Sequence, residues 1–254
     1  MRVRAQSWRA PGMILAGVFL AALGAIPGHA TPPNVITKAE YADPTSRYGH
    51  DVLGENAEWG RLRLTVDICM GCQGTDIREF NITLPENRVF EDIAPRLVDL
   101  DDDESPEVIV IESDSRLGSR LAVYYEGGLI SATPFIGTAY RWLAPLGAAD
   151  LDGDGIIELA YIDRPHLAKT LRVWRFEDRK LVEVASTPGL TNHRIGQDFI
   201  SGGIRDCGSG PEIITADSGW RRIMATRLVD ETLSTRDIGA FSGLLSLSAA
   251  LDCK

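Results

Sequence analysis

The feature that most constrains the fold of this chain is an internal repeat of about fifty residues. Three segments share one pattern: a short apolar strand, an acidic or glycine-rich loop, then a glutamate followed by an apolar run. Their first aspartates, Asp99, Asp150 and Asp206, lie 51 and 56 residues apart. A second alternating, β-branched hairpin follows each segment, with glycine or aspartate at its turn. Each repeat therefore predicts four antiparallel strands, which is the unit of a β-propeller blade.

A fourth blade is predicted from the two ends of the chain. Residues 61–67, 78–84 and 88–91 have strand patterns, and residues 244–253 resemble the first strand of a repeat. We therefore predict an all-β fold, a small propeller of four blades whose ring is closed by the C-terminal strand, because closure removes free sheet edges. Five blades are the alternative if residues 41–58 form their own partial sheet. A two-sheet sandwich is a weaker rival, because it would not predict repetition.

The first thirty residues have the pattern of a secretory signal peptide. Arg2, Arg4 and Arg9 precede an uncharged apolar run over residues 13–26, and Gly28 and Ala30 are small residues at a cleavage site after Ala30. The apolar run of about 14 residues is too short to span a bilayer of roughly 30 Å. We expect a cleaved leader, residues 1–30, and a single domain, residues 31–254, that is periplasmic or secreted. An uncleaved anchor is the alternative.

The net charge limits the kinds of partner that this chain is expected to bind. The 26 basic and 36 acidic side chains give a formal net charge of −10, and loss of three leader arginines would leave −13. No basic patch is available to neutralise phosphates, which speaks against nucleic acid. An acidic chain of this kind suits cations or basic partners better than anionic membranes. We expect a monomer without membrane insertion after leader removal, and an unknown protein or glycan as its ligand.

The four cysteines predict two disulfides, as an even count does in an exported chain. Three connectivities are possible. We favour Cys69–Cys72 and Cys207–Cys253, because the first pair brackets only two residues between predicted strands. No helix pattern follows Cys72, so a redox Cys-x-x-Cys motif is disfavoured.

The loop that begins at Asp150 has the spacing of a calcium site. Carboxylates at positions 1, 3, 5 and 9 and a carbonyl at position 7 can surround one Ca²⁺, and a glycine at position 6 permits the tight turn. Leu159–Ile162 has a strand pattern and position 12 is Tyr161, so an EF-hand is excluded. The predicted ligands are Asp150, Asp152, Asp154, Ile156 and Glu158. A merely solvated acidic turn is the alternative.

The first repeat has the same carboxylate spacing in its loop. Its predicted ligands are Asp99, Asp101, Asp103 and Glu107, but Glu104 replaces the glycine at position 6, and glutamate is costly at positive φ. The third repeat keeps only Asp206 and Glu212, with Cys207 between them. We predict that the third loop binds no metal in this way and is held by a disulfide instead.

These repeats resemble the FG-GAP/VCBS repeats of integrin-type β-propellers. The matching stretches are Asp99–Glu107 and Asp150–Glu158 with the strands that follow them, and the repeat pattern extends over roughly residues 45–254. The whole chain also resembles bacterial exported proteins of this repeat class. The resemblance implies structural Ca²⁺ and frequent use in adhesion or ligand binding, and it implies no catalysis. Because the family is functionally broad, it does not identify a partner.

A ligand pocket is predicted at the opposite ends of the strands. Arginine side chains can bind carboxylates, and tryptophan rings can stack on a sugar or a cation. The predicted ligand-binding residues are Arg47, Arg141, Trp142, Asp163, His166, His193 and Arg194. The alternative is that arginine and acidic side chains at these positions pair with each other and hold adjacent blades together.

We therefore predict an exported, calcium-binding propeller that serves as a ligand- or protein-binding module. No serine nucleophile motif and no zinc-binding histidine pair is present, so we expect no enzyme and assign no catalytic residue. The alternative is a calcium-dependent, carbohydrate-active hydrolase or lyase. For that case Asp163, His166 and His193 are the residues to test.

Overall fold

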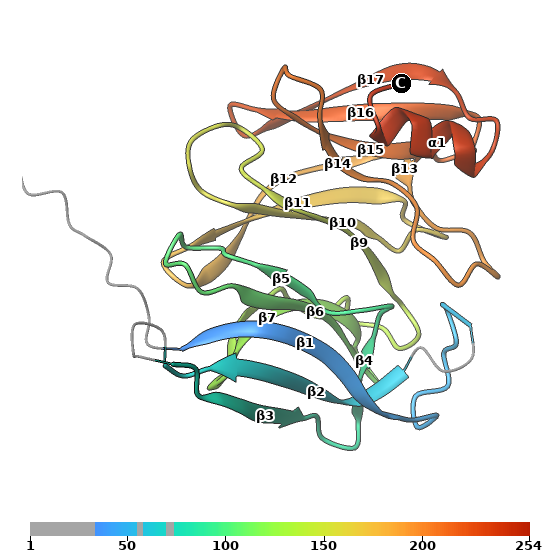
Figure 1. The fold of residues 1–254 in the computed structure, drawn as a ribbon. Coiled ribbons are helices and arrows are strands. Elements are labelled where there is room, and N and C mark those ends of the chain that lie inside the picture. Colours follow the sequence, from blue (N-terminus) through green and yellow to red (C-terminus); the bar gives the residue numbers. More distant parts are fainter. Residues whose placement is uncertain (1–33, 55–57, 70–73) are drawn as a thin grey trace, which may run out of the picture.

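A computed structural model describes residues 34–54, 58–69 and 74–254. It shows an all-β fold (Figure 1), as predicted, with a single short helix among the described residues. The strands are β1 (Val35–Pro44), β2 (Glu58–Asp67), β3 (Ile77–Thr83), β4 (Arg88–Glu91), β5 (Arg96–Val98), β6 (Glu107–Asp114), β7 (Gly118–Tyr125), β8 (Gly128–Ala132), β9 (Leu143–Ala149), β10 (Glu158–Asp163), β11 (Thr170–Glu177), β12 (Lys180–Pro188), β13 (Leu190–Thr191), β14 (Gly203–Asp206), β15 (Pro211–Asp217), β16 (Arg222–Val229) and β17 (Thr232–Ala240).

The three predicted repeats are present as antiparallel units. Repeat 1 is β5 to β8, repeat 2 is β9 to β12 and repeat 3 is β14 to β17, each with neighbouring strands paired in chain order. In every repeat the second strand is almost wholly buried: all eight residues of β6 and all six of β10 are buried. A strand covered on both faces reads as an apolar run, which is why these segments stood out in the sequence.

An N-terminal layer precedes the repeats. Strand β2 pairs with β1 along one edge and with β3 and β4 along the other, and β4 continues onto β6 of repeat 1. The sequence analysis predicted β2, β3 and β4 but not β1. The outer face of this layer is polar, with ion pairs from Arg61 to Asp43 (2.7 Å) and from Arg63 to Glu40 (3.4 Å).

The four layers are stacked (Figure 1). One apolar cluster lies between each pair of neighbouring layers. Leu62 and Leu64 of β2 pack with Val108 and Val110 of β6. Residues of alternate parity point the other way along each strand, so Ile109 and Ile111 of β6 pack with repeat 2. In the same way, Ala160 and Ile162 of β10 pack with repeat 3.

The predicted C-terminal strand is wrong, because this segment is helix α1 (Leu244–Leu251). Leu247, Ala250 and Leu251 lie on the helix face that contacts Ile214, Ile223 and Ala225 on the outer face of repeat 3. The segment contains no β-branched residue, and its leucines and alanines are good helix formers. Its alternation of leucine and serine gave a misleading strand signal.

The closed four-bladed ring is therefore not confirmed. The described sheets do not close, and no strand of the last layer pairs with the N-terminal layer. Helix α1 covers the outer face of the last layer instead, as capping elements do in repeat proteins. The predicted leader lies outside the described residues, and no described helix is long and apolar enough to cross a bilayer.

One predicted disulfide is present. Cys207, in the loop between β14 and β15, is bonded to Cys253 just after helix α1. The other predicted pair, Cys69–Cys72, includes Cys72, which lies outside the described residues.

Candidate cation sites and a polar pocket

The acidic loops lie at one end of the stack, where the first strand of each repeat turns into the second. In repeat 2 the loop joins β9 to β10, and in repeat 1 it joins β5 to β6. Each loop ends on a buried glutamate at the start of the second strand: Glu107 and Glu158 are 4% and 0% exposed. In both repeats 1 and 2, this glutamate and two of the loop aspartates have oxygen atoms within 4.8 Å of one another.

The loop of repeat 2 wraps around its own first aspartate. Asp150 accepts hydrogen bonds from the amides of Gly153 (2.7 Å), Asp154 (3.1 Å) and Gly155 (3.0 Å). Gly155 has a φ of 89°, which confirms the positive φ predicted at position 6. Ile156 donates its N–H to Asp154 Oδ1 (2.8 Å).

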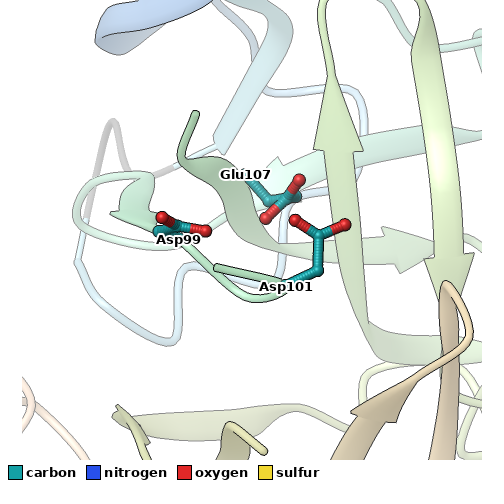
Figure 2. Close-up of side chains that lie close together, drawn as sticks. All are labelled: Asp99, Asp101 and Glu107. Carbon is teal, nitrogen blue, oxygen red and sulfur yellow. The ribbon is translucent and has the colours of Figure 1, made fainter. Parts of the chain in front are cut away.

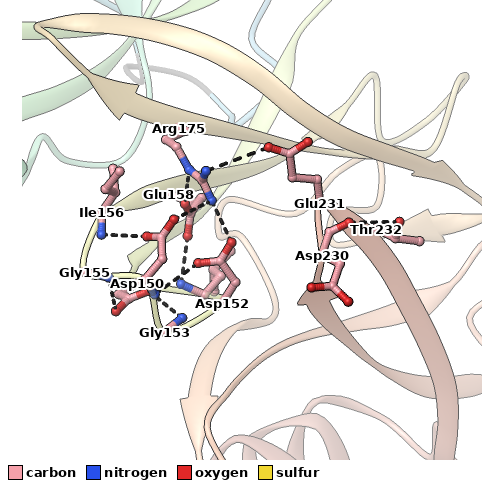
Figure 3. A network of polar contacts seen from close by, with 12 residues as sticks. Asp150, Asp152, Gly153, Gly155, Ile156, Glu158, Arg175, Asp230, Glu231 and Thr232 are labelled. Carbon is pink, nitrogen blue, oxygen red and sulfur yellow. Dashed lines mark hydrogen bonds and ion pairs between the residues drawn. The ribbon is translucent and has the colours of Figure 1, made fainter.

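A guanidinium lies against the carboxylates of this second loop (Figure 3). Arg175 of β11 donates from Nε to Glu158 (2.7 Å) and from Nη2 to Asp152 (2.6 Å), and Nη2 is 3.2 Å from Asp154. Glu158 pairs with Arg175 across β10 and β11, so the strand register places the charge there. Burial raises the pKa of Glu158, and the hydrogen bond from Arg175 opposes that shift. Part of the negative charge of the loop is therefore neutralised within the chain.

The loop of repeat 1 has the same arrangement without that guanidinium (Figure 2). The side chains of Asp99, Asp101 and Glu107 converge, and Glu107 accepts a hydrogen bond from the amide of Leu100 (3.0 Å). Asp99 accepts from the amides of Asp103 (3.2 Å) and Glu104 (3.0 Å). Glu104 has a φ of 71°, so this loop adopts the turn at position 6 in spite of the side chain.

The register explains why no guanidinium reaches Glu107. Val108 pairs with Tyr124, so Tyr125 occupies the position that Arg175 holds in repeat 2. The basic side chain beside this loop is Arg179 of the next repeat, whose Nη1 is 3.8 Å from Asp101 Oδ2. The other oxygen of Asp101, Oδ1, is buried without a hydrogen-bond partner. Burial, with the charges of Asp101 and Asp103, raises the pKa of Glu107 to about 7. These carboxylates are therefore poorly compensated, as cation ligands are before the ion is bound.

In repeat 3, by contrast, the loop glutamate is fully paired with basic side chains. Its glutamate, Glu212, accepts hydrogen bonds from three arginines, Arg205 (2.9 Å), Arg227 (2.8 Å) and Arg236 (2.6 Å). Burial opposes these hydrogen bonds, but together they lower the pKa of Glu212 to about 2. Asp206 accepts from the amides of Gly208 and Gly210. Arginines and the Cys207–Cys253 disulfide thus hold this turn. That it binds no metal stays a prediction.

A small polar pocket lies at the other ends of the strands. A hollow of about 40 Å³ is lined by His50, Tyr140, Arg141, Trp142, Arg164 and His166, together with Val52, Pro165 and Leu167. His166 Nε2 lies 2.8 Å from His193 Nδ1, and His193 Nε2 lies 3.0 Å from the carbonyl of Gln197. That carbonyl can only accept, so in neutral His193 the Nδ1 accepts from His166. Burial lowers the pKa of His166 to about 4 and also lowers that of His193.

Four of the predicted ligand-binding residues gather here: Arg141, Trp142 and His166 line the hollow, and His193 contacts both Trp142 and His166. The other three lie elsewhere. Asp163 is paired with Arg164 (2.8 Å) and Arg172 (3.1 Å). Arg47 donates to the carbonyls of Arg88 and Pro85, and Arg194 lies over the ring of Trp220.

His50, which lines the hollow, and its partner Glu91 were not among the predicted ligand-binding residues. His50 Nδ1 lies 2.7 Å from Glu91 Oε1, and Glu91 is 1% exposed and also accepts from Ser113. Burial raises the pKa of Glu91. The two residues are 41 positions apart and belong to different elements, so their spacing carries no signal.

Comparison with known proteins supports the repeat interpretation. Residues 99–161 match the family model of the FG-GAP-like repeat, a stretch that includes both acidic loops. The chain therefore carries an FG-GAP-like repeat, as its sequence resemblance predicted. No curated protein sequence matches the chain.

Among solved structures, an exotype rhamnogalacturonan lyase is similar, at 14% sequence identity and a TM-score of 0.44. The similarity covers 81% of this chain and 48% of the lyase, so the chain spans about half the length of that protein.

Proposed function

We propose that this protein is a calcium-binding repeat protein whose acidic loops hold the cation and which serves as a binding module. The observation that carries the proposal is the recurrence of one carboxylate triad at equivalent positions of two repeats. Hard carboxylate oxygens in a flexible loop suit Ca²⁺, which accepts six to eight oxygen ligands. Asp99, Asp101 and Glu107 would hold the ion in repeat 1, with Asp103 beside them. Asp150, Asp152 and Glu158 would do so in repeat 2, with Asp154 and Ile156 beside them.

Repeat 1 is the stronger candidate, although repeat 2 matches the sequence pattern more fully. The buried, unpartnered oxygen of Asp101 fits a missing cationic partner. In repeat 2 a cation must displace or share its ligands with Arg175, which is only 13% exposed and contacts three of the carboxylates. Losing charge-assisted hydrogen bonds of this kind costs about 1.5–3 kcal/mol. We therefore expect calcium to bind repeat 1 more tightly.

The direct test is calorimetric titration of the chelator-treated full chain with Ca²⁺ and then Mg²⁺. We expect a Ca²⁺-selective site with a dissociation constant of about 10⁻⁴ to 10⁻³ M, as in extracellular modules. Asp101→Asn should remove the tighter site, and Asp152→Asn should leave it intact. Arg175→Gln should strengthen binding at repeat 2. No heat of binding, or equal losses in the two aspartate variants, would contradict the proposal.

A second candidate function is ligand binding at the polar pocket. The supporting observation is that every histidine of the described residues lies there, beside Trp142 and Arg141. The hollow holds about one small polar group, so the ligand would insert a group rather than be enclosed. A glycan-binding screen should lose signal in Arg141→Ala but not in Arg116→Ala. Equal binding by both variants would exclude the pocket. The expectation that the protein is not an enzyme stays a prediction.

Export is supported only in part. The Cys207–Cys253 disulfide is consistent with an exported protein, because disulfides persist in oxidising compartments. Periplasmic or secreted localisation, a monomeric state and a protein or glycan partner remain proposals.

A further inference from the structure

We propose that the acidic loop of repeat 1 and the cleft beside it bind the guanidinium of an arginine from a partner protein. The cleft has a volume of about 450 Å³ and lies between the acidic loop of repeat 1 and the loop and hairpin turn of repeat 2. Asp101 and Asp103 contribute its acidic side, and Leu100, Ile156 and Phe176 contribute its apolar side. The proposal goes beyond calcium binding and does not require it.

The chain already contains this recognition in repeat 2 (Figure 3). There a guanidinium contacts the carboxylates at positions 3, 5 and 9 of the loop, namely Asp152, Asp154 and Glu158, at 2.6, 3.2 and 2.7 Å. In repeat 3 the glutamate at position 9, Glu212, likewise accepts from Arg227, which stands opposite it on the next strand. In two of the three repeats, an arginine thus contacts the glutamate at position 9 of the loop. The loop geometry is therefore suited to a planar, multidentate cation as well as to a spherical one.

Repeat 1 presents the equivalent acceptors, but among the described residues no arginine of its own sheet contacts them. Its carboxylates at positions 3, 5 and 9 are Asp101, Asp103 and Glu107, and the position opposite Glu107 holds the uncharged Tyr125. Asp101 Oδ1 is buried, and it accepts from no donor among the residues that the structure describes. Arg179 approaches Asp101 Oδ2 only to 3.8 Å and is about half exposed. Asp101 and Asp103, which line the cleft, thus remain available to an arginine from outside the sheet, whereas Glu107 is 4% exposed and does not line it. Arg179 also lines the cleft and lies over the ring of Tyr125, so an incoming arginine would share Asp101 with it.

The cleft also suits the rest of an arginine side chain. Arginine buries its aliphatic stem along apolar surface while its head remains charged, and Leu100, Ile156 and Phe176 offer such a surface next to the carboxylates. Glu177 and Asp178 add further negative charge to the lining. The net charge of −10 favours encounter with a basic partner. The partner that fits is therefore a protein segment that carries an arginine between small or apolar residues.

The two ligands of repeat 1 would exclude each other. Calcium and a guanidinium would both use the carboxylate of Asp101, so occupancy by one must weaken the other. A partner held by its arginine would then be released as calcium rises. This part alone rests on the proposed calcium site.

The test is titration of the full chain, in chelator, with acetyl-Gly-Arg-Gly amide, followed by isotope-edited NMR. The matched probe is the same peptide with citrulline, which keeps the shape and removes the charge. We expect saturable shifts at Leu100–Ser105 and Phe176–Arg179 with arginine, and none with citrulline. Asp101→Asn should weaken binding roughly tenfold or more, because a charge-assisted hydrogen bond is lost. Glu79→Gln, on β3 and outside the cleft, should change it little.

A second pair of variants recreates and controls the arrangement of repeat 2. Tyr125→Arg should place a guanidinium on Glu107 and abolish peptide binding, whereas Tyr125→Gln should preserve it. Equal shifts with citrulline, or full binding in Tyr125→Arg, would overturn the proposal. Calcium titration without peptide tests the calcium site separately. Peptide binding in chelator with no calcium effect would retain the arginine site and reject the competition.

Discussion

At the scale of single residues, one strand position separates the three repeats. Opposite the loop glutamate stand Tyr125 in repeat 1, Arg175 in repeat 2 and Arg227 in repeat 3. The glutamates follow this order: burial raises the pKa of Glu107 to about 7, whereas the arginines around Glu212 bring its pKa to about 2. The residue across the ladder therefore contributes to the internal neutralisation of a loop glutamate, together with Arg205 and Arg236 in repeat 3.

The raised pKa of Glu107 predicts a pH dependence of stability. Folded Glu107 holds its proton up to about pH 7, whereas the unfolded side chain loses it near pH 4.5. Its favourable contribution is therefore complete below pH 4.5 and is lost as the pH rises through 7. In chelator, Glu107→Gln should be more stable than the parent above pH 7 by roughly 2 kcal/mol after discounting solvent screening.

Urea unfolding of both proteins at pH 5 and pH 8 checks this difference. Glu79→Gln is the control, because Glu79 is exposed on β3 and far from the loops in the chain. A variant difference that does not change between the two pH values would contradict the prediction. The same Glu107→Gln variant should also lose the tighter calcium site, which links the stability gain to the ligand role.

At the scale of elements, helix α1 stands in the place of the strand that was expected to close the ring. It covers the outer face of repeat 3 with Leu247 and Ala250, and the Cys207–Cys253 bond joins its end to the β14–β15 loop. Arg205 also donates to the carbonyl of Ala250 near the helix C-terminus. Apolar packing, one covalent bond and one charged hydrogen bond thus hold the cap in place.

This packing predicts the effect of a leucine substitution in the cap. Leu247→Ala should lower the free energy of unfolding by about 2–5 kcal/mol, because a 2% exposed leucine leaves a cavity. Leu245→Ala is the matched control. Leu245 is 88% exposed, so its loss should change stability by less than about 0.5 kcal/mol. Thermal or chemical unfolding measures both, and similar losses would show that the helix does not pack as described.

At the scale of the whole molecule, a stack with two ends differs from a ring. In a closed ring every blade has two neighbours. Here the N-terminal layer, whose strand β4 continues into the sheet of repeat 1, and repeat 3 each pack against one neighbouring layer. Stability in such arrays depends on the interfaces between neighbours. The central layers, repeats 1 and 2, should therefore be the most protected part of the molecule.

Amide hydrogen exchange tests this gradient. We expect the slowest exchange in β6 and β10, which are buried along their whole length, and faster exchange in β1, β3 and β17. Protection that is equal in all four layers would indicate a closed ring in solution.

Much of this arrangement follows from the sequence alone, because it rests on local spacing. The fifty-residue period, the strand runs of the three repeats and the two carboxylate loops each depend on neighbours along the chain. The structure has these strands and brings three carboxylates together in each of the two loops. The loop of repeat 3 was likewise expected to lack ligands, because Asp206 and Glu212 are its only carboxylates.

The tertiary structure decided what depends on contacts between distant segments. The strand register brings Arg175 to Glu158, and this contact is the reason that we propose repeat 1 as the stronger cation site. The pocket of His50, His166 and His193 forms because three loops converge at one end of the stack. Residues 244–253 have an ambiguous local pattern, and they are helical because Leu247 and Ala250 have an apolar sheet face to cover. Spacing determines which groups can act together within a loop, whereas only packing determines which charges meet across strands.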